Sequence, residues 1–192
     1  MQTKTKLWLY WILATGAGGG IIAFFAAPTD FFWELLMSGF VTGFTQWLVL
    51  RRYIQPVFWW FPLSGLGWIL GVYFRISTGS LLDSVIRLLS DVGGLWEVLW
   101  LNVVNEPITF TLLGVAQWLV LRRYVKHSWL WILACFLGGI ARGAIGSIAC
   151  KFFCQLGFGI ISNGTGWAVS AAITGITLSW LLIKYPKTYP NS

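Results

Sequence analysis

Arg142 is the side chain in this sequence best suited to chemistry, because it is a cation inside a long apolar segment. At about 1.5 Å of helix per residue, it lies about 20 Å beyond Trp129, where that segment begins. An isolated cation inside a bilayer costs at least about 2.5 kcal/mol. We therefore expect Arg142 to form an ion pair with Glu34 or Glu106, or to extend toward the membrane surface. Substrate binding and a structural role are both compatible with this placement.

Gln46 and Gln117 are two further polar side chains within apolar segments. Each amide precedes a pair of arginines by about 7–8 Å of helix. A buried amide is expected to form hydrogen bonds, here with a neighbouring helix or with the other glutamine. Alternatively, the two side chains bind the magnesium of a pigment or line a polar path. We expect interhelical hydrogen bonds, with binding of a pigment or carotenoid cofactor as the alternative.

Cationic side chains follow the two glutamines at the ends of the same segments. Such side chains can hold anionic lipid headgroups, each contributing about 1 kcal/mol near a charged membrane surface. The same clustering also follows from topology alone, because Lys and Arg concentrate in cytoplasmic loops. The candidate headgroup ligands are Arg51, Arg52, Arg122, Arg123 and Lys126.

The remaining reactive side chains form no recognisable catalytic or metal-binding set. His127 is the single histidine and has no acidic neighbours in sequence, so it predicts neither a metal site nor a charge relay. Cys150 and Cys154 are one helical turn apart, and we interpret them as small apolar helix residues in preference to a redox pair. No nucleophile elbow, phosphate loop or zinc-protease motif occurs. The sequence therefore predicts a protein that is not an enzyme and has no metal site.

Long apolar segments must position these side chains. Of the 192 residues, 57% are hydrophobic and 10% are charged, whereas soluble domains carry about a quarter charged residues. A helix crosses a bilayer with about 20 apolar residues. We therefore predict one all-α transmembrane domain covering residues 1–192. Its predicted spans are about 7–27, 33–52, 57–75, 107–123, 128–150 and 163–183.

An internal repeat relates these spans. The sequence Gln-Trp-Leu-Val-Leu-Arg-Arg-Tyr occurs at residues 46–53 and again, without a change, at 117–124. A diverged copy lies in the last span, and each odd-numbered span begins with tryptophans and continues into glycines. Two spans per repeat return the chain to its starting side, so the copies are parallel around an axis normal to the membrane. The three predicted two-helix hairpins are about 7–53, 57–124 and 128–185.

Glycines spaced four residues apart predict that the helices approach closely, since lipid provides no hydrophobic drive for their association. The pairs are Gly16/Gly20, Gly39/Gly43, Gly67/Gly71 and Gly139/Gly143.

Charge divides between the two sides of this arrangement. Most Lys and Arg residues fall on the side that holds both termini, and all 6 acidic residues fall on the other. Both termini should therefore lie in the cytoplasm. The net charge of +7 reflects this topology, and nucleic acid is not an expected partner because no basic helix face or aromatic RNA-binding motif occurs.

Residues 76–106 are the one long stretch outside the predicted spans. Within it, residues 80–91 place apolar side chains on one face and polar ones on the other, which predicts an amphipathic helix lying in the membrane interface. Pro107 should then open the fourth span. Long loops with their own structure are often functional. We expect this non-cytoplasmic segment to dock other membrane proteins.

The pattern Gly-x-x-Gln-Trp-Leu-Val-Leu-Arg-Arg, followed by Trp-x-Trp-Ile-Leu-Ala and glycines, resembles that of small uncharacterised membrane proteins common in cyanobacteria and some other bacteria. The resemblance covers nearly all of the chain except 76–106. It implies a bacterial inner membrane or a cyanobacterial thylakoid, and it implies no established activity. The third copy departs from the pattern, with Leu178 and Ser179 in place of the glutamine and Lys184 in place of the arginine pair.

The leading functional interpretation is an accessory, assembly or scaffold subunit of a larger membrane complex, because few ionisable groups lie within the spans. The alternative is a small transporter or channel for a lipid or small solute that uses Arg142. A third interpretation, pigment or carotenoid binding, rests on the aromatic residues and the two glutamines.

Overall fold

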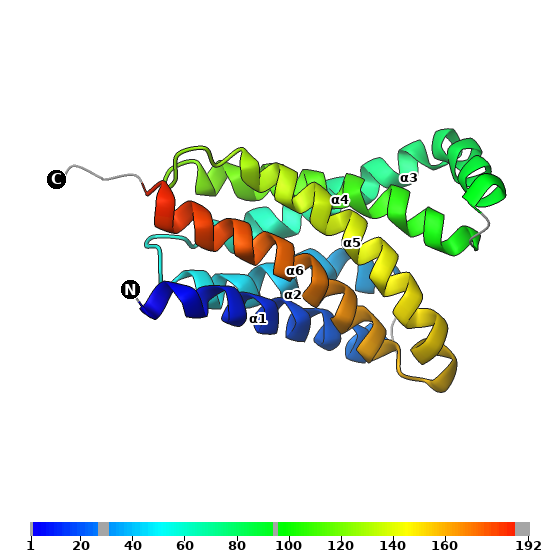
Figure 1. The fold of residues 1–192 in the computed structure, drawn as a ribbon, viewed down its shortest axis with the longest axis horizontal. Helices are drawn as coiled ribbons and strands as arrows, with labels where there is room; N and C mark the ends of the chain where they lie inside the picture. The colour runs from blue at the N-terminus through cyan, green and yellow to red at the C-terminus, as the bar shows by residue number, and fades with distance from the viewer. Residues whose placement is uncertain (1, 27–30, 94–95, 187–192) are drawn as a thin grey trace.

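The computed structural model describes residues 2–26, 31–93 and 96–186, and within them the side chains of residues 6–25, 37–93 and 96–186. This part of the chain is helical throughout, apart from its turns (Figure 1). The all-α prediction is therefore confirmed. The elements are α1 (Gln2–Ala26), α2 (Phe31–Leu50), α3 (Trp60–Gly93), α4 (Glu97–Leu121), α5 (Leu130–Phe153), the short 3-10 helix η1 (Cys154–Leu156) and α6 (Gly159–Lys184).

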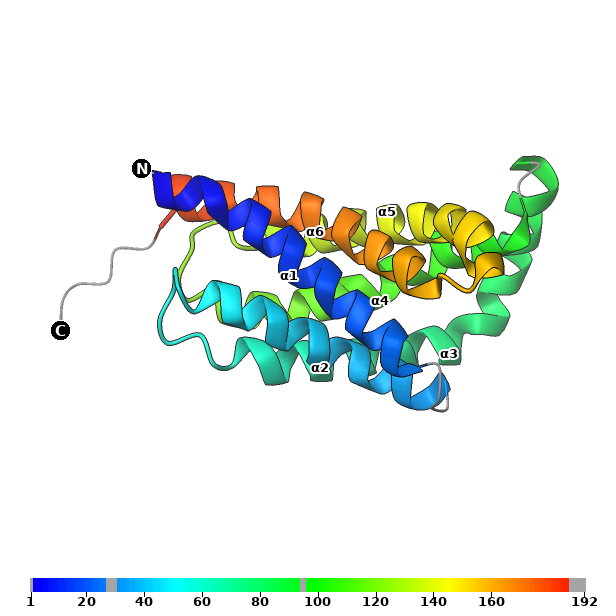
Figure 2. The same cartoon turned by 90° about the horizontal axis from the view of Figure 1, so that it is seen from below.

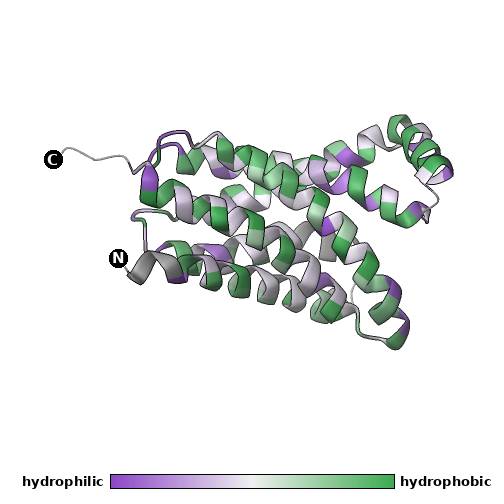
Figure 3. Ribbon diagram, viewed as in Figure 1, coloured by the Kyte–Doolittle hydropathy of each residue, from purple (hydrophilic) through white to green (hydrophobic). Residues whose placement is uncertain are grey.

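The helices have the length and composition of membrane spans. Five of those in the described chain, α1 and α3 to α6, are long and apolar enough to cross a bilayer. Large hydrophobic side chains such as Leu13, Leu70 and Ile176 are exposed along them, as expected for side chains that face lipid. Figure 3 shows hydrophobic residues along the helices and a strongly hydrophilic turn near the C-terminal end of α6. This is the architecture of an integral membrane protein.

The six helices form a closed ring in which each helix packs against the next and α6 packs against α1. Figures 1 and 2 show that the start of α1, the end of α6 and the turns after α2 and α4 gather at one end of the bundle. We call this the terminal end and the opposite one the far end. Because the chain returns to the terminal end after every second helix, the basic turns around Arg51 and Arg122 share it.

Glycines allow neighbouring helices of the ring to approach closely. A β-carbon placed on Gly71 of α3 would lie 2.7 Å from the α-carbon of Thr109, and one on Gly139 of α5 would lie 2.7 Å from that of Pro107. Both neighbours are backbone atoms of α4, which cannot move aside as a side chain can. At Gly20, by contrast, the nearest atom is a methyl group of Ile160 at 3.7 Å, an ordinary contact.

Residues 80–91 are helical, as predicted, but they are not a separate helix: they continue α3, which runs unbroken from Trp60 to Gly93. Their position in the membrane interface stays a prediction. Within this helix, the hydroxyls of Ser77 and Thr78 donate hydrogen bonds to the carbonyls of Tyr73 and Phe74, one turn back. Such bonds tend to bend helices, and Figure 2 shows the second half of α3 turning across the far end of the bundle.

The beginning of the fourth span also differs from the prediction. The helix α4 starts at Glu97, so Pro107 lies inside it and not in its first turn. Residues 76–93 and 97–106 are thus helical extensions of α3 and α4 beyond the predicted spans. They project at the far end (Figure 1).

Candidate functional site

Three tryptophans fill the axis of the bundle toward the terminal end. Trp11 of α1, Trp60 of α3 and Trp131 of α5 meet edge to face, with ring centroids 5.5–5.9 Å apart. Each is at most 1% exposed. Edge-to-face contacts are a favoured aromatic geometry. This tryptophan triad closes the interior at that level.

The two glutamines of the repeated motif accept hydrogen bonds from two tryptophans of the triad. The side-chain oxygen of Gln46 accepts a hydrogen bond from the indole N–H of Trp60 at 3.2 Å, and that of Gln117 accepts one from Trp131 at 3.1 Å. The amide nitrogen of Gln117 donates to the oxygen of Gln46 at 3.1 Å and to the hydroxyl of Ser64 at 2.9 Å. These interhelical bonds occupy the polar atoms that a pigment metal would need.

The third tryptophan finds its acceptor elsewhere. The indole N–H of Trp11 donates to the hydroxyl of Thr174 on α6 at 3.1 Å. Leu178, the residue in the glutamine position of the diverged copy, is fully buried. Thr174 lies one helical turn before it, so the loss of the glutamine is compensated by a neighbouring hydroxyl on the same helix.

A second aromatic cluster lies about two turns further toward the far end. It consists of Trp68 of α3, Phe110 of α4 and Trp167 of α6, with ring centroids 5.2–5.8 Å apart. The guanidinium carbon of Arg142 lies 4.8 Å from the ring centroid of Trp167, 5.8 Å from Phe110 and 6.0 Å from Trp68. These are cation–π distances. The three rings pack against the side of Arg142 that faces the terminal end, so they lie between Arg142 and the tryptophan triad.

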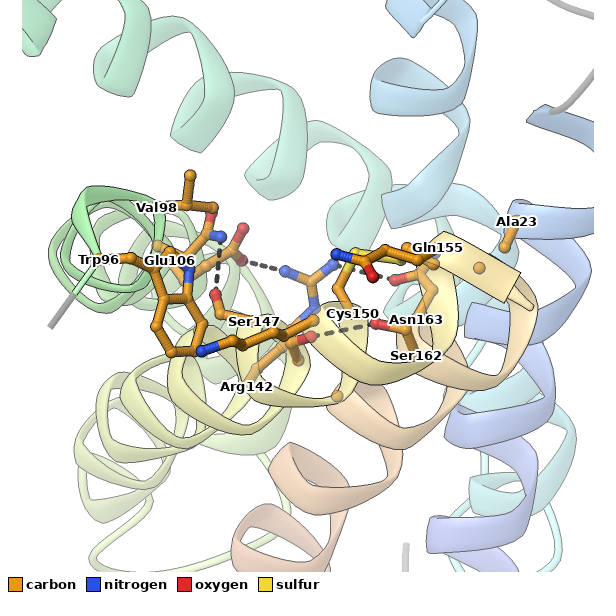
Figure 4. Close-up of a pocket in the computed structure, with 17 residues that line it drawn as sticks. Ala23, Trp96, Val98, Glu106, Arg142, Ser147, Cys150, Gln155, Ser162 and Asn163 are labelled. Carbon is orange, nitrogen blue, oxygen red and sulfur yellow. Dashed lines mark hydrogen bonds and ion pairs between the residues drawn. A yellow bond between two sulfur atoms is a disulfide. The ribbon is translucent and has the colours of Figure 1, made fainter. Parts of the chain in front are cut away.

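Arg142 also forms an ion pair. One of its terminal nitrogens lies 2.5 Å from Oε2 of Glu106, whose Oε1 lies 3.4 Å from Arg75. The other terminal nitrogen donates to Oδ1 of Asn163 at 3.3 Å, as Figure 4 shows. Of the two carboxylates expected as partners, Glu106 is thus the one that pairs with Arg142. The side chain of Glu34 lies outside the described residues.

A cavity of about 930 Å³ opens beside this ion pair at the far end, between α4, α5 and α6, with Ala23 of α1 also in its lining. Figure 4 shows Glu106, Arg142 and Asn163 on its walls, with Ser147 and Ser162 beside them. Ser162 donates to the carbonyl of Gly146, and Ser147 accepts from Asn102. The lining therefore combines ionic groups, amides, hydroxyls and glycine backbone, in a region otherwise built of apolar helices.

A disulfide joins Cys150 and Cys154 in the wall of the cavity. The interpretation of these cysteines as small apolar helix residues is therefore wrong. Cys150 lies in the last turn of α5 and Cys154 opens η1, four residues later. The 4.7 Å between their α-carbons falls within the range that disulfides need. Cys135, the third cysteine, is buried and unpaired.

The predicted headgroup ligands all lie at the terminal end and are exposed. The guanidinium of Arg51 stacks over Trp47 at 4.9 Å, and that of Arg122 over Trp118 at 5.2 Å. A smaller cavity of about 260 Å³ lies beside Arg122, bounded by Trp59 among others. The cavity and its cations could accept a headgroup, and this role stays a prediction. The predicted ligands Arg51, Arg52, Arg122, Arg123 and Lys126 do not contact the far-end cavity.

Sequence reasoning found Arg142 and Glu106 but missed the other residues of the far-end cavity. Asn102, Ser147 and Asn163 are ordinary polar residues, each in a different helix. The available signal was their place at or just beyond the acidic-side ends of three predicted spans. That place alone does not tell which side chains face one another.

Among the described residues, no group of three or more His, Cys, Asp or Glu side chains could hold a metal ion. No protein-family model, curated protein or solved structure matches the chain. The resemblance to cyanobacterial-type membrane proteins stays a prediction carried by the repeated motif.

Proposed function

We propose that this chain is a non-enzymatic integral membrane protein that acts as an accessory, assembly or scaffold subunit of a larger membrane complex. The observation that carries the proposal is an apolar stripe on the far-end extension of α3. Leu81, Val85, Leu88 and Val92 recur at helical spacing and are 75%, 46%, 61% and 80% exposed. Ile86, on the opposite face, is 2% exposed. A contiguous exposed apolar patch at the end of a bundle supports a docking surface.

The interior supports the same proposal. Gln46 and Gln117 are engaged in holding tryptophans, and Arg142 is held by Glu106 and by aromatic rings. These groups stabilise the bundle itself. A partner is therefore expected to bind outside the ring, through an apolar helix face of its own. Pigment binding is not proposed, because the glutamine oxygens already accept bonds from indole N–H groups.

The proposed membrane topology has both termini in the cytoplasm and three parallel hairpins, α1–α2, α3–α4 and α5–α6. Equivalent hydrogen bonds from Trp60 to Gln46 and from Trp131 to Gln117 support the repeat. The Cys150–Cys154 disulfide supports the orientation, because disulfides persist in oxidising compartments. In a bacterial inner membrane or a thylakoid, the far end would then face the periplasm or the lumen.

Site-specific photocrosslinking in the native membrane tests the docking role. A photoreactive residue at Leu88, on the stripe, is compared with one at Leu70, on the spanning part of the same helix, where the exposed fraction is nearly equal (61% and 59%). We expect a discrete protein adduct from position 88 and only lipid adducts from position 70. Leu88→Asp should release the chain from its complex in mild detergent. A chain that migrates alone, with no adduct from either position, would rule out the docking role.

A second candidate function, transport of a lipid or small solute, is favoured by the far-end cavity. The two aromatic clusters lie between this cavity and the terminal end, so transport would require them to separate. Flux measured in proteoliposomes and abolished by Arg142→Ala would support this candidate. Flux that is unchanged by Arg142→Ala would exclude Arg142 from the transport path.

A further inference from the structure

We infer that the far-end cavity binds a phosphate-type oxyanion, carried either by a lipid headgroup or by a small solute, with Arg142 and Lys151 as its cationic ligands. This site is independent of the docking role of α3, and it supplies a ligand class for the second candidate function.

The charges around the cavity favour an anion. Arg142 and Lys151 line it, and Glu106 is the single carboxylate among the described lining residues. The charge of Glu106 is shared between Arg142 and Arg75, at 2.5 Å and 3.4 Å. The described lining thus holds two cations, Arg142 and Lys151, and one carboxylate, so its net charge is positive. A cationic ligand would find its only carboxylate already occupied by two guanidinium groups.

Arg142 retains unused donors that a phosphate group can accept. Its guanidinium carries five N–H groups. Among the described residues, one terminal nitrogen donates to Asn163, and the other is in ion-pair contact with Glu106. Its buried Nε has no hydrogen-bond partner among them. Arginine is the side chain best suited to oxyanions, because its planar fork can bind two oxygens at once. The rings of Trp167, Trp68 and Phe110 hold this fork in place.

Lys151 provides a second cation near the mouth of the cavity. Its ammonium lies 4.7 Å from the ring centroid of Trp96, which also lines the cavity. The first turns of α6 complete the wall with Gly159, Ser162 and Asn163. A helix N-terminus adds backbone N–H groups and a partial positive charge that favour an anion.

The cavity is also large enough for the proposed ligand. Its volume of about 930 Å³ lies within the roughly 300–1,000 Å³ typical of small-molecule sites. A β-carbon at Gly159 would meet no atom within 4 Å, so the space beside it is open. A phospholipid headgroup or a phosphorylated solute would fit the volume and match the charge.

Binding measurements on the purified protein in phosphatidylcholine nanodiscs test the inference. One arm titrates inorganic phosphate by calorimetry, and the other adds phosphatidylglycerol and counts retained lipids by native mass spectrometry. Gly159→Trp should fill the cavity and abolish binding. Lys151→Gln should weaken binding about tenfold, as expected from losing a charge-assisted hydrogen bond of about 1.5 kcal/mol. Gly79→Trp is the matched control, because a β-carbon at Gly79 of α3 also meets no atom within 4 Å, and it should bind as the unaltered protein does.

Saturable binding of phosphatidylglycerol that both cavity variants weaken would support a lipid ligand, and the same result with inorganic phosphate would support a solute. Lys151 is exposed, so Lys151→Gln keeps the test decisive if Gly159→Trp does not fold. Absence of saturable binding in both arms would overturn the inference. So would binding that neither cavity variant changes. Either result leaves the crosslinking test of the docking role unaffected.

Discussion

Gln117 shows how a single polar residue can organise a membrane helix bundle. It is 1% exposed, accepts a hydrogen bond from Trp131, and donates to Gln46 and Ser64. In a setting without water, each of these groups would otherwise be left without a partner. The recurrence of the glutamine in both copies of the motif is therefore explained by the hydrogen bonds that Gln46 and Gln117 accept from the tryptophan triad.

Replacing Gln117 with leucine should destabilise the protein by about 1–2 kcal/mol, because the buried indole N–H of Trp131 loses its acceptor. Leucine is tolerated at position 178 because the hydroxyl of Thr174 accepts the bond from Trp11. The acceptor for Trp131, by contrast, is the side chain of Gln117 itself. Unfolding in mixed micelles provides the measurement. Gln55→Leu, at an exposed loop glutamine, is the matched control. Equal stability of the Gln117 and Gln55 variants would contradict the explanation.

The ion pair of Arg142 and Glu106 predicts that substitutions at the two positions have non-additive effects on stability. Arg142→Met should cost about 3 kcal/mol of stability, because it leaves a carboxylate that is 9% exposed with only the more distant Arg75. Adding Glu106→Gln removes that charge, so the double variant should be more stable than Arg142→Met alone. A double-mutant cycle measures this coupling. Strictly additive effects of the two substitutions would argue against the pair.

At the scale of helices, the close approach of α3, α4 and α5 depends on residues without side chains. Gly71 and Gly79 lie in the same helix, but only Gly71 has the backbone of Thr109 at 2.7 Å from where a β-carbon would stand. Elements that pack this tightly cannot accept even one methyl group without moving apart.

Gly71→Ala should therefore destabilise the bundle by about 1–3 kcal/mol. Gly79→Ala should leave it unchanged or stabilise it by up to about 1 kcal/mol, since alanine is the better helix former. Thermal unfolding of the two variants in detergent gives the comparison. A stabilised Gly71→Ala variant would show that α3 and α4 are not in close contact at this point.

Periodicity and composition predicted the helices well but not all of their limits. The apolar runs placed six helices, and the repeat placed Gln46 and Gln117 at matching depths. The amphipathic pattern of residues 80–91 was real, but nothing in it distinguishes a separate helix from the continuation of α3. That distinction depends on residues 76–79, which connect the two stretches and are helical in the structure.

The candidate site was predictable only in part, because it depends on how the helices are rotated in the ring. Arg142 was conspicuous as a charge in an apolar segment, and Glu106 was one of two acids near its depth. Asn102 and Asn163 carry no such signal. Cys150 and Cys154 were correctly placed one turn apart, but spacing alone does not reveal whether two thiols are oxidised.

The whole molecule has two ends with different chemistry. The terminal end carries the basic turns and the tryptophan triad. The far end carries the cavity with Arg142 and Glu106 in its lining, the disulfide, and the apolar stripe of α3. Because the cavity and the stripe both lie at the far end, a ligand in the cavity and a partner on the stripe would both bind from the same side of the membrane.

The measurement that tests this account most directly is cysteine labelling of intact and permeabilised cells with a membrane-impermeant maleimide, on a background without native cysteines. Single cysteines replace Gln55 and Lys126 at the terminal end and Gln155 at the far end, all of them exposed. The account predicts that position 155 is labelled in intact cells and that positions 55 and 126 are labelled only after permeabilisation. Labelling of positions 55 and 126 from opposite sides of the membrane would contradict it.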